Sequence, residues 1–327
     1  MYLPLQIERA SMNFDVSTFA ASPEEEIYRG YEIEDLALVA SFAGPVAAPD
    51  PDFIIDFFGV KTRSSLFGGL WGGHVVEEPP IPSDSRLAEG IEYVSACIAL
   101  EQSKGRTFTH VEVGAGWGPW TTTLATLALR RGFSTVNAVA VEASKSRFEL
   151  LKINLVDNGL LPTTGVTEAT TGRLNTRIFN AAGWWKDTNL FFPSSDDAGD
   201  AGMAATGSRS RTDYRGIPSR PVKVPAMSIA KLCAPYDVVD FMHIDIQGGE
   251  WELIKKAKKT FDSKVRFLFV GTHSRKIEGD LIDLLLNKGW KLFREKPCRF
   301  HTMGETPALT GLTYHDGAQF WRNMHIA

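Results

Sequence analysis

Three glycines alternate with other residues in the segment VEVGAGWGPW, namely Gly114, Gly116 and Gly118. We predict that they join a strand at 108–113 to a helix from about 120 to 131, because glycine allows a tight turn without a Cβ in the way. A turn of this kind lets backbone amides approach a nucleotide-containing ligand. Pro119 stands where the dinucleotide fingerprint GxGxxG has its third glycine, so the pattern disfavours NAD.

Two carboxylates accompany this turn. Glu142 ends the next predicted strand, at 136–142, where it can accept hydrogen bonds from both hydroxyls of a ribose. Its structural alternative is a favourable charge at the start of a helix predicted at 144–158. Glu112 lies just before the loop and can hold loop amides or, through water, the ammonium of an amino-acid group. S-adenosylmethionine has both a ribose and such an ammonium, and therefore fits better than NAD.

Asp245 and His273 lie at the ends of two later predicted strands, at 238–246 and 265–271. Ligands of open α/β sheets bind at the carboxyl ends of the strands, so we expect both side chains to face the second substrate. A base or a metal ion there would speed the reaction of a hydroxyl by roughly 10² to 10⁴. Asp245 has a structural alternative as a helix N-cap. His243, deeper in its strand, is predicted to be a buried, hydrogen-bonded histidine.

No His-x-His, HExxH or clustered acid pattern demands a metal ion, so no metal site is predicted. A divalent cation bound by Asp245 together with oxygens of the second substrate stays open as an alternative.

The elements that position these residues alternate between strands and helices from residue 84 onward. This alternation predicts an α/β fold with a mostly parallel sheet covered on both faces. The first helix is expected to have Ser83 or Asp84 as its N-cap, and a last strand at 318–323 is expected to return antiparallel at a sheet edge. The other predicted elements lie at 108–113, 120–131, 136–142, 144–158, 238–246, 250–259, 265–271, 279–288 and 290–295.

The first 83 residues differ in composition, being acidic, then Pro-rich, then Gly-rich. We interpret residues 1–83 as an accessory or cap segment and residues 84–327 as the main domain. Residues 193–221, rich in Gly, Ser, Ala and charge, predict a long mobile loop that is either a disordered insertion or a lid. Arg63, Glu89 and Glu92 are interpreted as surface charge or as first-turn helix residues.

The overall charge is modest, with a formal net value of -4 over 327 residues, so we expect no nucleic-acid partner. The basic run at 255–259 is interpreted as the solvated face of a helix. The N-terminus lacks a signal-peptide pattern and no stretch is apolar enough for a membrane span, which predicts a protein neither exported nor embedded in a membrane. The cysteines suggest neither zinc nor disulfides, so a cytoplasmic location is expected; they are Cys97, Cys233 and Cys298.

The chain resembles the FkbM family of methyltransferases over roughly residues 84–323. The resemblance is carried by VEVGAGWGPW, the strand end at Glu142, NAAGWW (180–185), HIDIQGGEWELIKKA (243–257) and VGTHS (270–274). The family motifs usually read DxGANxG and DxEGxE. In this chain Glu112 replaces the aspartate, Gly116 the asparagine and Gln247 the first glutamate, so a negative charge is absent at position 247.

The resemblance implies a Rossmann-like class I methyltransferase fold with S-adenosylmethionine as cofactor. It also implies that the three loop glycines line the methionine end of the cofactor and that Glu142 binds the ribose. Trp117 is expected either to close over the cofactor or simply to pack. The remaining expected cofactor-site residues are Glu112, Ala115 and Ala143, with Asn180, Ala181 and Ala182 on the adenine side.

The function predicted on these grounds is O-methylation of a hydroxyl on a small molecule, a sugar or a natural-product scaffold, with Asp245 and His273 as the catalytic residues. Two rival functions are an NAD(P)-dependent oxidoreductase and a noncatalytic cofactor-binding protein of the same fold. Pro119 and Glu112 count against the first rival. The pair Asp245 and His273 counts against the second. The expected partner is a small-molecule acceptor, and the oligomeric state is not predicted.

Overall fold

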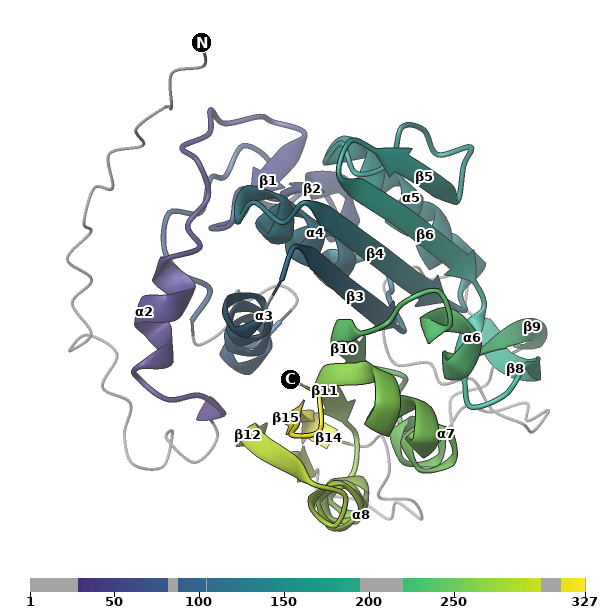
Figure 1. Ribbon diagram of the computed structural model, residues 1–327. Helices are drawn as coiled ribbons and strands as arrows, with labels where there is room; N and C mark the ends of the chain where they lie inside the picture. Colours follow the sequence, from purple (N-terminus) through teal and green to yellow (C-terminus); the bar gives the residue numbers. More distant parts are fainter. Residues whose placement is uncertain (1–28, 82–87, 104, 195–219, 301–312, 327) are drawn as a thin grey trace.

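The computed structural model describes residues 29–81, 88–103, 105–194, 220–300 and 313–326. Its centre is an eight-stranded sheet with helices on both faces (Figure 1). In spatial order the strands are β12 (Trp290–Lys296), β15 (Gly317–Asn323), β11 (Val265–Thr272), β10 (Val239–Ile244), β3 (Thr107–Val113), β4 (Thr135–Glu142), β6 (Leu174–Asn180) and β5 (Glu168–Thr171).

The five central strands, from β11 to β6, are parallel, which confirms the predicted mostly parallel sheet, although β6 itself was not among the predicted elements. The chain runs outward from β3 through β4 to β6 and then returns to β10 on the other side of β3. The boundary between β3 and β10 is therefore the point where the strand order reverses. Open α/β sheets bind their ligands at such a point, beyond the carboxyl ends of the strands.

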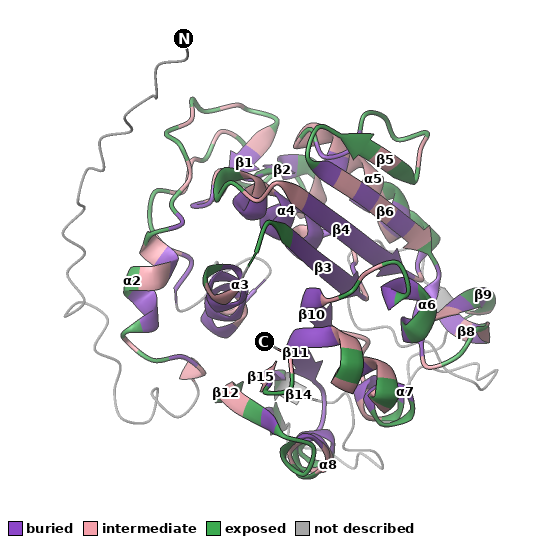
Figure 2. Cartoon of the chain, viewed as in Figure 1, coloured by how far each residue is buried: buried purple, intermediate pink, exposed green. Residues whose placement is uncertain are grey.

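Successive residues of a strand face opposite sides of the sheet, so both faces carry apolar side chains. A layer of helices covers each face. Phe241 belongs to one apolar cluster, with α3 (Gly90–Gln102), α4 (Pro119–Arg130) and α5 (Lys145–Asp157). Met242 belongs to the other, with α6 (Ile229–Cys233), α7 (Glu250–Lys264) and α8 (Arg275–Leu286). Figure 2 shows the consequence, since the central strands are buried along most of their length.

Several predicted boundaries need correction. The strand predicted at an edge, β15, is antiparallel to its neighbours, but it lies between β11 and β12 and hydrogen-bonds to both. Helix α8 begins at Arg275 rather than 279, and α7 continues to Lys264 rather than 259. Helix α3 begins at Gly90, where Glu89 and Glu92 form a capping box. The predicted caps Ser83 and Asp84 lie outside the described residues.

A small second sheet, which the sequence pattern did not predict, lies beyond the end of β6. It contains β7 (Ala182–Trp184), β9 (Arg220–Ser228) and β8 (Thr188–Ser194), with β9 in the middle. The ends of the segment predicted as a mobile loop at 193–221 therefore belong to β8 and β9, since Ser194 pairs with Arg220. The rest of that segment, 195–219, lies outside the described residues.

The N-terminal segment packs onto the α3, α4 and α5 side of the sheet. It contains α2 (Asp35–Ala40), β1 (Phe53–Ile55), β2 (Lys61–Arg63) and the 3₁₀ turn η2 (Ser64–Phe67). The ring of Phe58 lies 5.5 Å from that of Tyr93 on α3. Arg63 makes a bidentate ion pair with Asp157 on α5, at 2.6 and 2.8 Å. The boundary at 83/84 stays a prediction. A short hairpin, β13 (Arg299–Phe300) and β14 (Thr313–His315), precedes β15.

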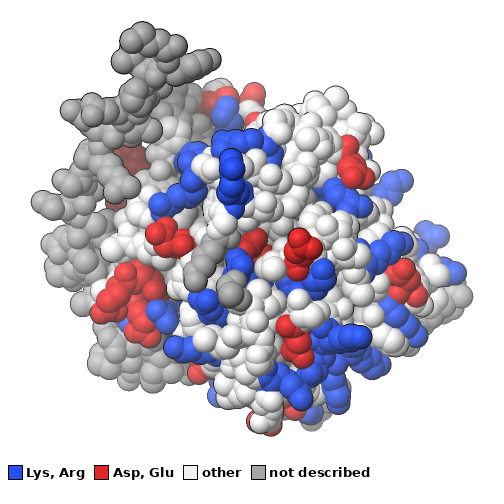
Figure 3. All heavy atoms as spheres, in the orientation of Figure 1, with Lys and Arg blue, Asp and Glu red and all other residues white. Residues whose placement is uncertain are grey.

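The surface carries both signs of charge. Lys256 and Lys258, in the basic run on α7, pair with Glu252 and Asp262 of the same helix. Figure 3 shows acidic and basic side chains interspersed on the face in view. None of the helices in the described part of the chain has the length and apolar character of a membrane span. Cys97, Cys233 and Cys298 are free and buried, and burial raises the pKa of each thiol.

Candidate active site

A cavity of about 880 Å³ opens at the carboxyl ends of β3, β4, β10 and β11. Its floor comes from the residues that follow these strands, and its walls from η2, the start of α3 and the start of β15. The cavity thus lies at the point where the strand order reverses, as expected for a ligand site of this fold. Its volume is within the range of pockets that hold drug-sized molecules, roughly 300 to 1,000 Å³.

The glycine turn after β3 forms one side of this cavity. All three glycines have positive φ values, of 82°, 57° and 78° in chain order. A Cβ on Gly114 would lie 1.9 Å from the backbone oxygen of Asp245, and one on Gly118 would lie 2.1 Å from Leu151 Cδ1. A Cβ on Gly116 would meet no atom within 4 Å. Gly114 and Gly118 therefore allow close packing, whereas Gly116 opens onto the cavity.

Glu112 holds the first turn of α4. The backbone amides of Trp120 and Thr121 donate to its carboxylate at 3.3 and 2.6 Å, and the Thr121 hydroxyl also donates to it. The side chain is buried, and burial raises the pKa of Glu112 to about 7, although His243 and the donors from Thr121 and Trp120 oppose this shift. Of its two predicted roles, the structure shows the binding of backbone amides.

Glu142 holds two further turns at the end of β4. The Gly116 amide donates to Oε2 at 2.6 Å and the Ser144 amide donates to Oε1 at 2.6 Å. Burial raises the pKa of Glu142, while these two amides lower it. Each carboxylate oxygen can accept more than one hydrogen bond, so Glu142 keeps acceptor capacity toward the cavity that it lines. Asn180 supports this corner by donating to the Glu142 backbone oxygen at 2.9 Å.

Aromatic rings form much of the remaining wall. Trp117 packs edge-on against Phe67 of η2, with ring centroids 6.4 Å apart. Trp120 stacks on His243 at 5.5 Å, and its indole nitrogen donates to Glu92 at 3.1 Å. His243 Nε2 lies 3.2 Å from the same Glu92 carboxylate, which confirms that His243 is buried and hydrogen-bonded. Glu92 is therefore more than the first-turn residue predicted, since it joins the cavity wall to α3.

Asp245 is the half-exposed carboxylate of the cavity floor, just after β10, with 39% of its side chain accessible. Its Oδ1 accepts a hydrogen bond from Gln247 Nε2 at 2.9 Å, and its backbone amide donates to Val113 at the end of β3. Gln247 has a φ of 60°, a left-handed conformation that is uncommon for a residue with a Cβ. Asp245 lines the cavity from the turn that precedes α7. It is not the N-cap of that helix, because α7 begins only at Glu250.

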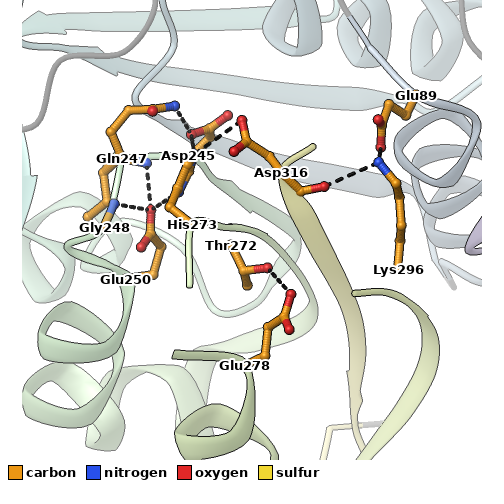
Figure 4. A network of polar contacts seen from close by, with 11 residues as sticks. Glu89, Asp245, Gln247, Gly248, Glu250, Thr272, His273, Glu278, Lys296 and Asp316 are labelled. Atoms are coloured by element: carbon orange, nitrogen blue, oxygen red, sulfur yellow. Dashed lines mark hydrogen bonds and ion pairs between the residues drawn. The ribbon is translucent and has the colours of Figure 1, made fainter. Parts of the chain in front are cut away.

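His273 lies behind Asp245 in a buried ionic network (Figure 4). Its Nδ1 is 3.1 Å from Glu250 Oε1, and its Nε2 is 3.5 Å from Asp245 Oδ1 and 3.7 Å from Asp316 Oδ2. Burial lowers the pKa of His273, but the carboxylates of Glu250, Asp245 and Asp316 outweigh it and raise the pKa to about 10. An imidazolium at neutral pH cannot act as a base.

Most of the predicted site residues meet at this cavity. Those that line it are Glu112, Gly114, Ala115, Gly116, Trp117, Glu142, Ala143, Ala181, Ala182 and Asp245. Three others support it from behind in the described part of the chain, namely Gly118, Asn180 and His273. Prediction from sequence missed the lining residues Ser65, Leu66, Phe67, Arg147, Leu150, Trp184, Phe192, His315 and Asp316. Except for Trp184, which lies in the motif NAAGWW, they come from elements without a recognisable motif, so only packing reveals them.

Comparison with known proteins agrees with this geometry. The family model for the methyltransferase FkbM domain matches residues 111–292. A curated protein from Jannaschia sp. (strain CCS1), named "Putative methyltransferase", is 27% identical over 259 residues, which cover 77% of this chain and 86% of that protein.

Solved structures were found at lower similarity. One is methyltransferase FkbM from Methylobacillus flagellatus KT, with 12% identity and a TM-score of 0.37, covering 72% of this chain. This chain spans 56% of the length of that protein. Another is the C-terminal domain of precorrin-6Y C5,15-methyltransferase from Rhodobacter capsulatus, with 12% identity, a TM-score of 0.36, and coverage of 73% and 90% of the two chains.

Proposed function

Because this chain belongs to the FkbM methyltransferase family, we propose that it binds S-adenosylmethionine in the cavity and methylates a hydroxyl group of a small-molecule acceptor. The observation that carries the proposal is the glycine turn after β3, where Gly116 opens onto the cavity and Glu142 holds its amide. An adenosine-containing ligand fits such a turn, with its ribose against the carboxylate that ends the second strand.

The residues present fit this cofactor. Glu142 offers its remaining lone pairs to the ribose hydroxyls, and the small side chains of Ala143, Ala181 and Ala182 leave room beside it for the adenine. Gly116 and Trp117 also line the cavity, and the methionine group would lie along this glycine turn. When bound, S-adenosylmethionine supplies an electrophilic methyl group on a sulfonium.

The protein contributes mainly alignment, because displacement at a methyl carbon requires the attacking oxygen, the carbon and the sulfur in line. Asp245 is placed to orient the acceptor hydroxyl and to accept its proton, since its carboxylate is half-exposed on the cavity floor. His273 and Gln247 act as positioning residues because both contact Asp245. In the protein without a bound cation, the positive charge of His273 favours the ionised form of Asp245.

Calorimetry tests the cofactor assignment. We expect S-adenosylhomocysteine to bind with a dissociation constant in the micromolar range and NAD to bind far more weakly. Glu142→Ala should weaken binding by about 1 to 3 kcal/mol, because it removes a charged acceptor. Glu149→Ala is the matched control, since Glu149 is half-exposed on α5 and forms a surface ion pair with Lys152. Tighter binding of NAD than of S-adenosylhomocysteine would contradict the assignment.

Mass spectrometry tests the acceptor. Extracts of the native host that contains the protein should include a metabolite that is heavier by one methyl group than its counterpart in extracts of the host without the protein. Fragmentation locates the added methyl group, and resistance to mild alkali distinguishes a methyl ether on a hydroxyl oxygen from a methyl ester. Wild-type protein that binds the cofactor and methylates nothing in such extracts would favour the noncatalytic alternative.

A further inference from the structure

His273 is held at one ring nitrogen and open at the other. Nδ1 faces the fully buried Glu250, whereas Nε2 is buried without a hydrogen-bond partner and points between two carboxylates. Those carboxylates belong to Asp245 and Asp316, at 3.5 and 3.7 Å. Figure 4 shows both of them turned toward the His273 ring. Two carboxylate oxygens thus lie within 3.7 Å of the same ring nitrogen, at the edge of the cavity.

Three neighbouring strands bring these residues together. Asp245 follows β10, His273 follows β11, and Asp316 immediately precedes β15, and these strands are adjacent in the sheet. Two glycines make the close approach possible. A Cβ on Gly271 would lie 3.2 Å from Asp245 Cγ, and one on Gly317 would lie 2.0 Å from Glu278 Oε1. The sheet therefore fixes the backbone of the cluster, and the side chains of Asp245 and Asp316 extend from it toward the cavity, 39% and 55% exposed.

Glu250 orients the histidine. Its Oε1 accepts hydrogen bonds from the amides of Ile246 and Gly248 at 3.2 and 2.9 Å, so the turn before α7 fixes it in place. Asp245, Glu250 and His273 do have ligand atoms within 4.8 Å of one another. However, Glu250 and Asp245 face opposite nitrogens of the ring, and a single ion cannot replace both contacts. A carboxylate behind a metal-binding histidine is a common arrangement, because it fixes the tautomer and the ring plane.

We propose that Nε2 of His273 and the carboxylates of Asp245 and Asp316 bind a divalent cation at the acceptor end of the cavity. The cation takes the place of the proton on Nε2, which is released to water. The nitrogen and oxygen donors suit Mn²⁺, Fe²⁺ or Zn²⁺ better than Ca²⁺ or Mg²⁺, which prefer oxygen alone. Asp245 and Asp316 are 39% and 55% exposed and line the cavity, so acceptor oxygens can complete the coordination. The role of the ion, which rests on the proposed function, is to polarise the acceptor hydroxyl.

Titration of purified full-length protein with Mn²⁺, without acceptor, tests the site. Unbound Mn²⁺ is measured by electron paramagnetic resonance, and S-adenosylhomocysteine binding is measured in the same samples. Wild type should bind Mn²⁺, and Asp316→Asn and His273→Gln should each lower the affinity about tenfold or more. Asp280→Asn is the matched control, because Asp280 pairs with Lys276 on the surface of α8. Its affinity should equal that of wild type.

The outcomes separate this proposal from the proposed function. If wild type binds S-adenosylhomocysteine but neither Mn²⁺ nor Zn²⁺, the cation site is wrong and the cofactor assignment stands. If wild type binds Mn²⁺ but not S-adenosylhomocysteine, the cofactor assignment is wrong and the cation site stands. Equal loss of Mn²⁺ in Asp316→Asn and Asp280→Asn would show nonspecific binding and overturn the site. Because His273 is buried and its variant can lose structure, the exposed Asp316 gives the decisive comparison.

Discussion

Two acidic residues of the site use part of their hydrogen-bonding capacity on the protein's own backbone. Glu142 was predicted from its position to face a ligand, and Glu112 either to face one or to hold loop amides, and both do line the cavity. Their oxygens nevertheless already accept hydrogen bonds from backbone amides of α4, the glycine turn and Ser144. The spacing of a motif shows where a carboxylate lies, but not how many of its lone pairs the folded chain has taken.

For His273, too, the sequence shows where the side chain lies but not which groups surround it. Its place after β11 was predictable, and a titration near pH 6 to 7 was the natural expectation for an imidazole. The expectation failed because Glu250 and Asp316, distant in sequence, lie on either side of the ring. With a pKa of about 10, His273 keeps its proton over the physiological range. In the protein without a bound cation, His273 is therefore not expected to titrate near pH 6 to 7.

Glu112 gives a testable pH dependence at the residue scale. Burial raises its pKa from 4.5 to about 7, so between these values the folded state keeps a proton that the unfolded chain has lost. Stability from this group is therefore highest below about pH 4.5 and falls as the pH rises to 7, by at most about 1.4 kcal/mol per pH unit. Glu112→Gln should show a smaller fall.

Urea denaturation at about pH 5 and about pH 7.5 measures this difference. Glu149→Gln, at a half-exposed position of α5, serves as control and should follow wild type. If Glu112→Gln loses as much stability as wild type between the two pH values, Glu112 is not the protonated group.

At the scale of elements, glycines in the turn between β3 and α4 have two different roles: Gly114 allows close packing, and Gly116 leaves space in the cavity. Gly114→Ala should destabilise the protein by about 2 to 4 kcal/mol, because its Cβ would overlap the Asp245 backbone in addition to the strain of a positive φ. Gly116→Ala should cost only about 1 to 2 kcal/mol of backbone strain, but its methyl group would enter the cavity and weaken S-adenosylhomocysteine binding. Thermal unfolding and calorimetry on both variants provide the comparison. Equal stability losses would show that the Asp245 backbone can move away from the added Cβ at position 114.

The elements that could be predicted are those with a repeating apolar pattern. Strands β3, β4, β10 and β11, and the helices that follow them, were found from it because both faces of a parallel sheet are buried. Strands β7 to β9 form a separate sheet and were missed. Strand β7 has only three residues, and β9 mixes exposed and buried residues without a regular apolar pattern. The position of β15 between β11 and β12 depends on pairing partners that no local pattern reveals.

At the scale of the whole molecule, the N-terminal segment shares the core of the main domain. Leu36, Val39 and Phe58 belong to the same buried cluster as Ile91 and Phe241. In addition, Asp35 makes a bidentate ion pair with Arg294 of β12, at 2.7 and 2.9 Å. Although its composition differs from that of the rest, the described part of this segment packs as part of one structure.

Phe58→Ala tests this interpretation. The side chain is 1% exposed, and its loss should lower the free energy of unfolding of the whole protein by about 3 to 5 kcal/mol. Val46→Ala, in the same segment but fully exposed, should change it by about 0.5 kcal/mol or less. Chemical denaturation monitored by tryptophan fluorescence gives both values. A separate early transition in Phe58→Ala, with the main transition unmoved, would show that the segment folds independently.

The insertion of β15 between β11 and β12 has a consequence for the order of folding. Strand β12 comes before β15 in the chain, yet among the described residues its only strand partner is β15, so this end of the sheet cannot assemble in the order of synthesis. The arrival of β15 also brings Asp316 beside His273. A ligand that needs both residues can therefore recognise only molecules that have completed this last step, and by binding them it would draw unfinished chains toward the native state.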